Sequence, residues 1–341
     1  MGNPGWDEVL AEFRSLGGVA DNVRLGYGSR GRGLFVIDPA KPATVHVPEN
    51  MLVPTEDFEI RDDRLAIKSQ SKLGDPERRF FERYDKHCGS QAGLLDETWR
   101  QQTQWSELPV DVRQFIMTMG AIEEPERRFA TPSLELCLHD FVRSRDILYR
   151  EKPHFAPLID LLNHSSAASD YVIGEGIAAE GIYEDEVLVK YNDVDSWALM
   201  LHYGFADACV RAYSLGGITV DLYARHTLSI SREVVRREVH AGFVFPVAEA
   251  SGNAIGLSHL TLGNFNGLAL PRAIFRNVMG GVLDAPRADE VFESIVYYNR
   301  GRFHALLRLL NKYDGPLIGT LRDAALHQLE ALSACVGAQP L

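Results

Sequence analysis

The order of strand-like and helix-like segments is the feature of this 341-residue chain that most restricts its fold. Six short stretches, rich in β-branched residues and bounded by turn residues, predict strands: 23–27, 34–37, 44–47, 171–173, 176–179 and 187–191. Between the third and the fourth, residues 74–150 instead show helical spacing of apolar side chains. A β region that is interrupted by a helical insert predicts an α+β fold.

Helices are predicted at both ends of the chain and in its middle. Apolar residues recur at helical spacing in 6–16, in 133–149 with Ser133 as N-cap, and in a short amphipathic stretch at 196–202. Residues 288–332 predict two long helices, interrupted at Asp314-Gly315-Pro316. The stretch before them, from about residue 225, is mixed.

Composition excludes several classes of protein. The chain has 35 Lys and Arg against 47 Asp and Glu, so its net charge of −12 disfavours a nucleic-acid partner. No stretch of about 18 apolar residues predicts a membrane span, and the acidic N-terminus does not predict a signal peptide. The four cysteines form no CxxC pair, which favours reduced thiols in a cytoplasmic protein.

Three motifs offer groups for chemistry. The first, GSRGRGLF over residues 28–35, lets backbone approach a ligand closely at its glycines. A dinucleotide fingerprint would need a third small residue where Val36 stands and a helix opening there, so a hairpin turn is favoured over a Rossmann site.

The second motif is the Asn163-His164 pair that follows the apolar run Asp160-Leu161-Leu162. On its own it predicts a turn whose polar groups are satisfied locally. A metal site is disfavoured, because His154, His164 and His202 lack the spacing that places two ligands on one helix face.

The third motif combines EVLVKYN, residues 186–192, with LHYGF, residues 201–205. A predicted strand ends at Tyr191, and Tyr203 precedes a Gly-Phe pair. Each tyrosine alone is most often a structural aromatic.

In this order the three motifs resemble those of the SET-domain protein methyltransferases, in the subgroup of the RuBisCO large-subunit lysine methyltransferase. That resemblance implies small β-sheets around a pseudoknot, with the segment of Asn163 threaded near the segment that leads to Tyr191. It also implies S-adenosylmethionine as cofactor, no metal, and a lysine side chain of a non-histone protein as the target.

The resemblance further implies a domain layout. A SET domain would span residues 1–214, with its core at about 20–70 and 140–210 and the helical insert at about 71–139. Residues 215–341 would form a mainly helical C-terminal lobe that helps to recognise a protein substrate. The sequence indicates nothing about the oligomeric state.

The resemblance also assigns roles to individual residues. The residues implied to bind S-adenosylmethionine are Arg30, Gly31, Arg32 and Gly33 through their backbone, Arg145 near the carboxylate, Asn163 at the amino group, the His164 backbone at the adenine, and Phe205 by packing. Tyr191 is the implied catalytic tyrosine, and Tyr203 would complete the ring of oxygens around the methyl group. Two alternatives stay open: an inert SET-like binding module, which both tyrosines argue against, and a protein-histidine methyltransferase. A metal-dependent hydrolase is least favoured.

Overall fold

Two hydrophobic cores divide the chain into two units. The computed structural model describes residues 4–120, 124–209, 211–223, 226–233, 239–240, 243–263 and 269–335. Unit 1 comprises Met1–Thr103 and Ala130–Asn192, and unit 2 comprises Gln104–Phe129 and Asp193–Leu341. Both units contain helices and strands, so the predicted α+β class is confirmed.

This division differs from the expected boundary after residue 214. Residues 193–214 belong to unit 2, and so do residues 104–129 of the expected helical insert. The reason is apolar packing, because Trp105, Val112 and Ile116 are buried in the core of unit 2.

Unit 1 holds most of the small sheets. Its helices are α1 (Pro4–Ser15), α2 (Asp75–His87), α6 (Leu134–Arg143) and the greater part of α3 (Leu94–Ser106), with short 3-10 turns η1 (Glu49–Met51), η2 (Thr55–Asp57), η3 (Ser90–Ala92) and η4 (Ile159–Leu161). Its strands are β1 (Val19–Asp21), β2 (Val23–Gly28), β3 (Gly31–Val36), β4 (Ala43–Pro48), β5 (Val53–Pro54), β6 (Phe58–Arg61), β7 (Arg64–Ile67), β8 (Asp146–Tyr149), β9 (Lys152–Phe155), β10 (Asn163–His164), β11 (Val172–Gly174), β12 (Gly176–Gly181) and β13 (Leu188–Val189).

Local sequence explains the first elements of unit 1. Helix α1 buries Val9 and Phe13, which lie one turn apart on one face. Strand β4 alternates strictly, so that Ala43, Val45 and Val47 point into the core. It lies between β1 and β12 in a four-stranded sheet of order β1-β4-β12-β11.

The predicted helix over 133–149 is too long. Ser133 caps α6 by accepting a hydrogen bond from the Leu136 amide, but the helix ends at Arg143. Residues 146–149 form β8, which pairs with β9 in a hairpin. Its two loop residues, Arg150 and Glu151, both adopt positive φ (48° and 65°), the geometry of a tight hairpin turn that usually contains glycine.

Strand pairing brings together distant parts of unit 1. Strands β2 and β3 form an antiparallel hairpin in which Gly28 pairs with Gly31. Residues 185–189 lie between β3 and β10: the Val36 and Val187 amides bond to the Asp185 and Leu34 carbonyls. On the other side, β13 pairs in parallel with β10, Leu188 opposite Asn163. The implied pseudoknot stays a prediction, because the strand pairing shows only that these segments lie side by side.

Unit 2 contains the long helices and a sheet that the sequence did not predict. Its helices are α4 (Val110–Met117), α5 (Pro125–Arg128), α7 (Ser196–Tyr203), α8 (Ala269–Met279), α9 (Ala285–Leu310) and α10 (Pro316–Cys335). Its strands are β14 (Ala212–Tyr213), β15 (Ile218–Asp221), β16 (Thr227–Ile230), β17 (Val239–His240), β18 (Phe243–Val244), β19 (Ala248–Ser251), β20 (Ala254–Leu257) and β21 (Thr261–Gly263).

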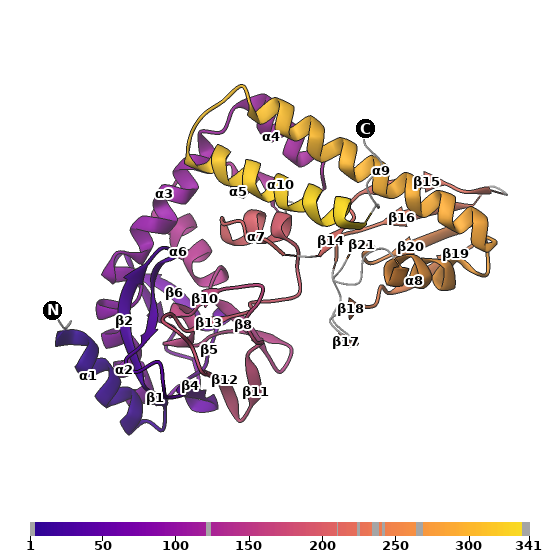
Figure 1. Cartoon of the computed structure of the whole chain (residues 1–341). Coiled ribbons are helices and arrows are strands. Elements are labelled where there is room, and N and C mark those ends of the chain that lie inside the picture. Colours follow the sequence, from indigo (N-terminus) through magenta and orange to yellow (C-terminus); the bar gives the residue numbers. More distant parts are fainter. Residues whose placement is uncertain are drawn as a thin grey trace. The chain divides into compact units, whose positions relative to one another are not determined.

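The two predicted C-terminal helices are present as α9 and α10, which lie side by side (Figure 1). Phe303, Leu306 and Leu310 are buried, as their helical spacing predicts. The new sheet has the order β15-β16-β20-β19. Its inner face contributes Leu228 and Ile255 to the same core as α9.

Buried ion pairs stabilise the beginning of the second segment of unit 2, which follows Asn192. Asp195 caps α7 by accepting from the Ala198 amide at 2.9 Å, and it also accepts from the Tyr213 amide at 3.0 Å. Arg232 forms an ion pair with the same carboxylate, and Asp195 is 0% exposed. A second buried pair joins Arg211 to Asp193. In the described part of the chain, no helix is long and apolar enough to cross a membrane.

Two helix-capping aspartates allow a matched test of this buried network. Asp284 caps α9 in the same way as Asp195, but its side chain is largely exposed. We expect Asp284→Ala to lower the free energy of unfolding by about 1 kcal/mol, the usual value for a lost cap. Asp195→Ala leaves Arg232 buried without its carboxylate, so the loss should be about 3–5 kcal/mol. Urea unfolding measures both, and equal losses would contradict the importance of the buried pair.

Candidate functional site

The glycine motif forms the β2–β3 hairpin, as the hairpin interpretation predicted. Gly31 has a φ of 91°, a conformation that glycine adopts without strain, and open space lies where its side chain would be. Gly33 is different. A Cβ there would lie 2.7 Å from both the Asn163 Nδ2 and the Glu186 Oε1 atoms, so the position accepts no side chain unless those groups move.

Asn163 is held in a fixed orientation beside this hairpin. Its Nδ2 donates to the Arg32 carbonyl at 3.1 Å and to Glu186 Oε1 at 2.7 Å. Both amide hydrogens are therefore used within the protein. Its Oδ1 accepts no hydrogen bond from any described residue, and so remains an acceptor for a ligand.

Glu186 is a site residue to which the sequence analysis gave no role. Its side chain is 8% exposed, and Oε2 lies 3.4 Å from Arg30 Nη1, whose side chain is 45% exposed. The only sequence signal is the alternation of side chains along a strand. Val187 and Val189 are buried in the core, so Glu186 has to face the other side of its strand.

His164 and Tyr191 are joined by several contacts. The Tyr191 amide donates to His164 Nδ1 at 3.1 Å, so the imidazole carries its proton on Nε2, which lies 3.2 Å from Ser166 Oγ. The centroids of the two rings are 5.1 Å apart. The Tyr191 hydroxyl donates to the Leu162 carbonyl at 2.7 Å, which directs the lone pairs of the phenolic oxygen elsewhere. The segments of Asn163, His164 and Tyr191 thus lie close together, and the roles that the resemblance implies for these residues stay predictions.

The arginines of the predicted set behave differently from one another. Arg30 is exposed at the hairpin tip. The Arg32 side chain is buried and donates to the His87 and Ala92 carbonyls, so it braces the hairpin rather than facing a ligand. Arg145 follows the end of α6, stacks over the Phe141 ring at 4.3 Å and bonds to Ser144 Oγ.

Asp160 is a second residue for which the sequence analysis predicts no role. The Tyr84 hydroxyl of α2 donates to its Oδ1, and its Oδ2 is shielded from solvent without a hydrogen-bond partner among the described residues. Loss of solvation raises the pKa of this carboxyl to about 7, although Tyr84, Arg145 and Arg32 each act to lower it. The residue lies in η4, three positions before Asn163.

Tyr203 and Phe205 belong to unit 2. Tyr203 is the last residue of α7, and the centroid of its ring lies 6.0 Å from the centroid of the Phe205 ring. Because the other candidate residues belong to unit 1, a shared site with Tyr203 and Phe205 stays a prediction. Among the described residues, no group of three or more His, Cys, Asp or Glu side chains is arranged to hold a metal ion.

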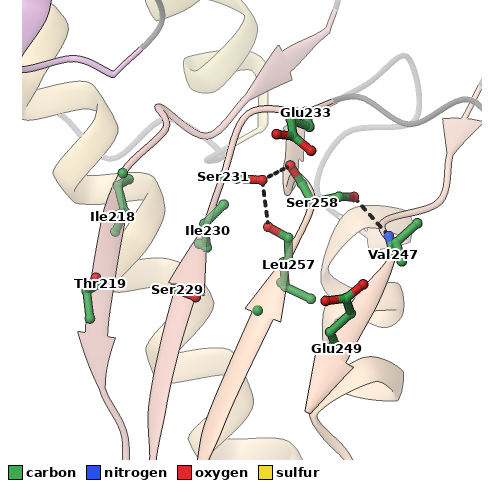
Figure 2. A pocket seen from close by; sticks show the side chains of 12 residues that line it. Ile218, Thr219, Ser229, Ile230, Ser231, Glu233, Val247, Glu249, Leu257 and Ser258 are labelled. Carbon is green, nitrogen blue, oxygen red and sulfur yellow. Dashed lines mark hydrogen bonds between the residues drawn. The ribbon is translucent and has the colours of Figure 1, made fainter. Parts of the chain in front are cut away.

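A recess of about 400 Å³ lies on the outer face of the new sheet in unit 2 (Figure 2). Figure 2 shows that two of its hydroxyls already have backbone partners: Ser231 donates to the Leu257 and Ser258 carbonyls, and Ser258 Oγ accepts from the Val247 amide. None of the candidate residues lines it. The chemically equipped site is therefore that of unit 1.

Comparisons with known proteins find matches among solved structures alone. No family model matches the chain, and no curated protein matches it. Thirteen chains of solved structures match. One of them, described as "Structure of Rubisco LSMT bound to AdoMet", has 15% sequence identity and a TM-score of 0.45, with coverage of 96% of this chain and 90% of that chain. At this TM-score and identity, the similarity assigns neither a family nor a function.

The tight packing at Gly33 predicts the effect of a single methyl group. Gly33→Ala forces Asn163 and Glu186 apart, so we expect a loss of about 1–3 kcal/mol in the free energy of unfolding. Gly301 in α9 has open space around it and a helical environment. Gly301→Ala should stabilise the chain by up to about 1 kcal/mol, since alanine favours a helix. Chemical denaturation of both variants checks the opposite signs.

Burial of Asp160 predicts a pH dependence. Its native pKa of about 7 lies above the ordinary value of 3.8, so its ionisation destabilises the fold as pH rises from about 4 through 7. Asp160→Asn keeps an acceptor for Tyr84 and removes this titration. Between pH 5 and pH 8, the stability of the variant relative to the native chain should rise by roughly 2 kcal/mol. A constant difference in urea unfolding at the two pH values would contradict the assignment.

Proposed function

We propose that this chain is a protein methyltransferase that uses S-adenosylmethionine and transfers a methyl group to a lysine side chain. The observation that carries the proposal is the convergence in unit 1 of the Gly31–Gly33 backbone, Asn163 and Tyr191, which come from three motifs far apart in the sequence. These are the motifs whose order resembles that of the SET-domain methyltransferases.

The acceptor oxygens of the site fit the positive end of S-adenosylmethionine. Asn163 Oδ1 is an acceptor for its α-ammonium group, and the Glu186 carboxylate lies beside that amide. A cation is favoured there by charge, since Arg30 is largely exposed and offsets Glu186 only weakly. The open space at Gly31 lets a ligand approach the backbone of the hairpin.

When bound, S-adenosylmethionine supplies an electrophilic methyl group on a sulfonium. Tyr191 then has to align the attacking amine, because alignment is the main need of an in-line displacement. With its proton engaged by Leu162, the Tyr191 oxygen acts as an acceptor for the amine and not as a proton donor. A lysine with an ordinary pKa of about 10.4 is mostly charged at pH 7, so an apolar approach that disfavours the charged form assists the reaction.

Two measurements test the proposal. Calorimetry with S-adenosylmethionine, after treatment with a chelator, should show binding without any metal. Incubation with methyl-labelled S-adenosylmethionine and cell lysate should label a protein, and hydrolysis of that band should give methyllysine. Methylhistidine instead would support the alternative target. If the native chain neither bound the compound nor labelled any protein, the proposed function would be wrong.

Removing one hydroxyl should separate chemistry from binding. We expect Tyr191→Phe to keep cofactor affinity nearly unchanged but to lower the turnover of the labelled protein by about 10²–10³-fold, because a positioned polar group at the methyl is lost. Asn163→Ala should behave oppositely, with cofactor affinity falling first.

Tyr149→Phe is the matched control for stability. It also removes a hydroxyl of unit 1 that lies at hydrogen-bond distance from a backbone carbonyl, that of Gly174, and in addition from the Glu49 carboxylate. Both Tyr→Phe variants should lose about 1 kcal/mol of stability, but only Tyr191→Phe should lose turnover. Full activity of Tyr191→Phe would show that another residue aligns the amine, with Tyr203 the next candidate.

A further inference from the structure

We propose that Glu186 is a positioning residue that fixes the Asn163 amide, so that its oxygen is the atom presented to a cationic amine. The inference rests on the proposed function, in which that amine is the α-ammonium group of S-adenosylmethionine. Glu186 acts through Asn163, and its effect is therefore on ligand selection.

An asparagine amide has two distinct ends, and a rotation of 180° exchanges them. In the observed orientation the Nδ2 group faces two acceptors, the Arg32 carbonyl at 3.1 Å and Glu186 Oε1 at 2.7 Å. In the exchanged orientation Oδ1 would face those two oxygens, and Nδ2 would repel a bound ammonium. Of the two contacts, that with Glu186 is shorter and involves a charge, so it contributes more to the preference.

Glu186 is itself held in place. Its neighbours in the chain bond to β3 through the Val36 and Val187 amides, and its own position opposes Phe35. Its Oε1 occupies the space left by the missing side chain of Gly33. The carboxylate therefore cannot follow the amide if Asn163 turns.

The charge of Glu186 is incompletely balanced by the described residues. Its side chain is 8% exposed, and its ion-pair partner Arg30 lies 3.4 Å away with a side chain 45% exposed. An ion pair with an exposed partner stabilises a carboxylate only weakly. A bound ammonium at Asn163 Oδ1 would add a second positive charge near Glu186, which links the two residues in selecting a positive ligand.

The test compares two ligands by calorimetry: S-adenosylhomocysteine and its analogue in which hydrogen replaces the α-amino group. The native chain should prefer the amine by at least about tenfold, as a hydrogen bond to a charged group implies. Glu186→Met fills the same space without acceptor oxygens, and should reduce the preference to near unity. Glu186→Gln keeps an oxygen for Asn163 Nδ2 and should retain most of the preference. Glu184→Gln, at an exposed position two residues earlier, is the control for charge.

The outcomes separate the two proposals. If the native chain bound neither compound, the proposed function and this inference would both fall. If it preferred the amine and Glu186→Met kept that preference, only the positioning role would be overturned. Should Glu186→Met fail to fold, Glu186→Gln decides alone: a retained preference supports positioning, whereas its collapse assigns the effect to charge and rejects the role of the amide.

Discussion

Residues 185–189 are the segment on which the candidate site depends. They bond to β3 on one side and to β10 on the other, so they join the N-terminal hairpin to a segment about 130 residues further along the chain. Val187 and Val189 fix this segment by burial, and alternation then places Glu186 beside Asn163. Displacing this short stretch would separate Gly33, Asn163 and Tyr191 at once.

The polar groups around the site divide into those that support it and those that face a ligand. Some side chains form hydrogen bonds to neighbouring protein atoms, namely those of Arg32, His164 and the Tyr84–Asp160 pair. They fix the hairpin, the backbone at Tyr191 and the turn η4. The groups left over at the site are Asn163 Oδ1 and the Glu186 carboxylate, and under the proposed function these acceptors face a positively charged ligand.

Much of this arrangement follows from the sequence, because local signals specify it. The Ser133 cap, the alternation in 43–48 and the break before Pro316 all act within a few residues. Residues 146–149 are predicted as helix but form β8, because the turn that follows at Arg150-Glu151 lacks glycine, and its positive φ values accompany strand pairing. The unit 2 sheet was missed for a related reason: its parallel β16–β20 pairing joins residues separated by a long connection. In the site, the order of the motifs indicates that Asn163 and Tyr191 lie together, but the alternation around Glu186 indicates only which side of the strand it faces, and not that Asn163 lies there.

The division of the chain into units also determines when each core can form during synthesis. The chain leaves unit 1 after Thr103, returns at Ala130 and leaves again after Asn192. On the ribosome, unit 1 therefore lacks β10 and β13 until about residue 190 has emerged. The apolar residues in and beside α4, Trp105 and Ile116 among them, wait longer still, because the core that buries them also contains residues of α9, which begins only at Ala285. A nascent chain of this protein thus carries exposed apolar side chains in its middle until α9 has been made, and unburied apolar surface of this kind favours aggregation.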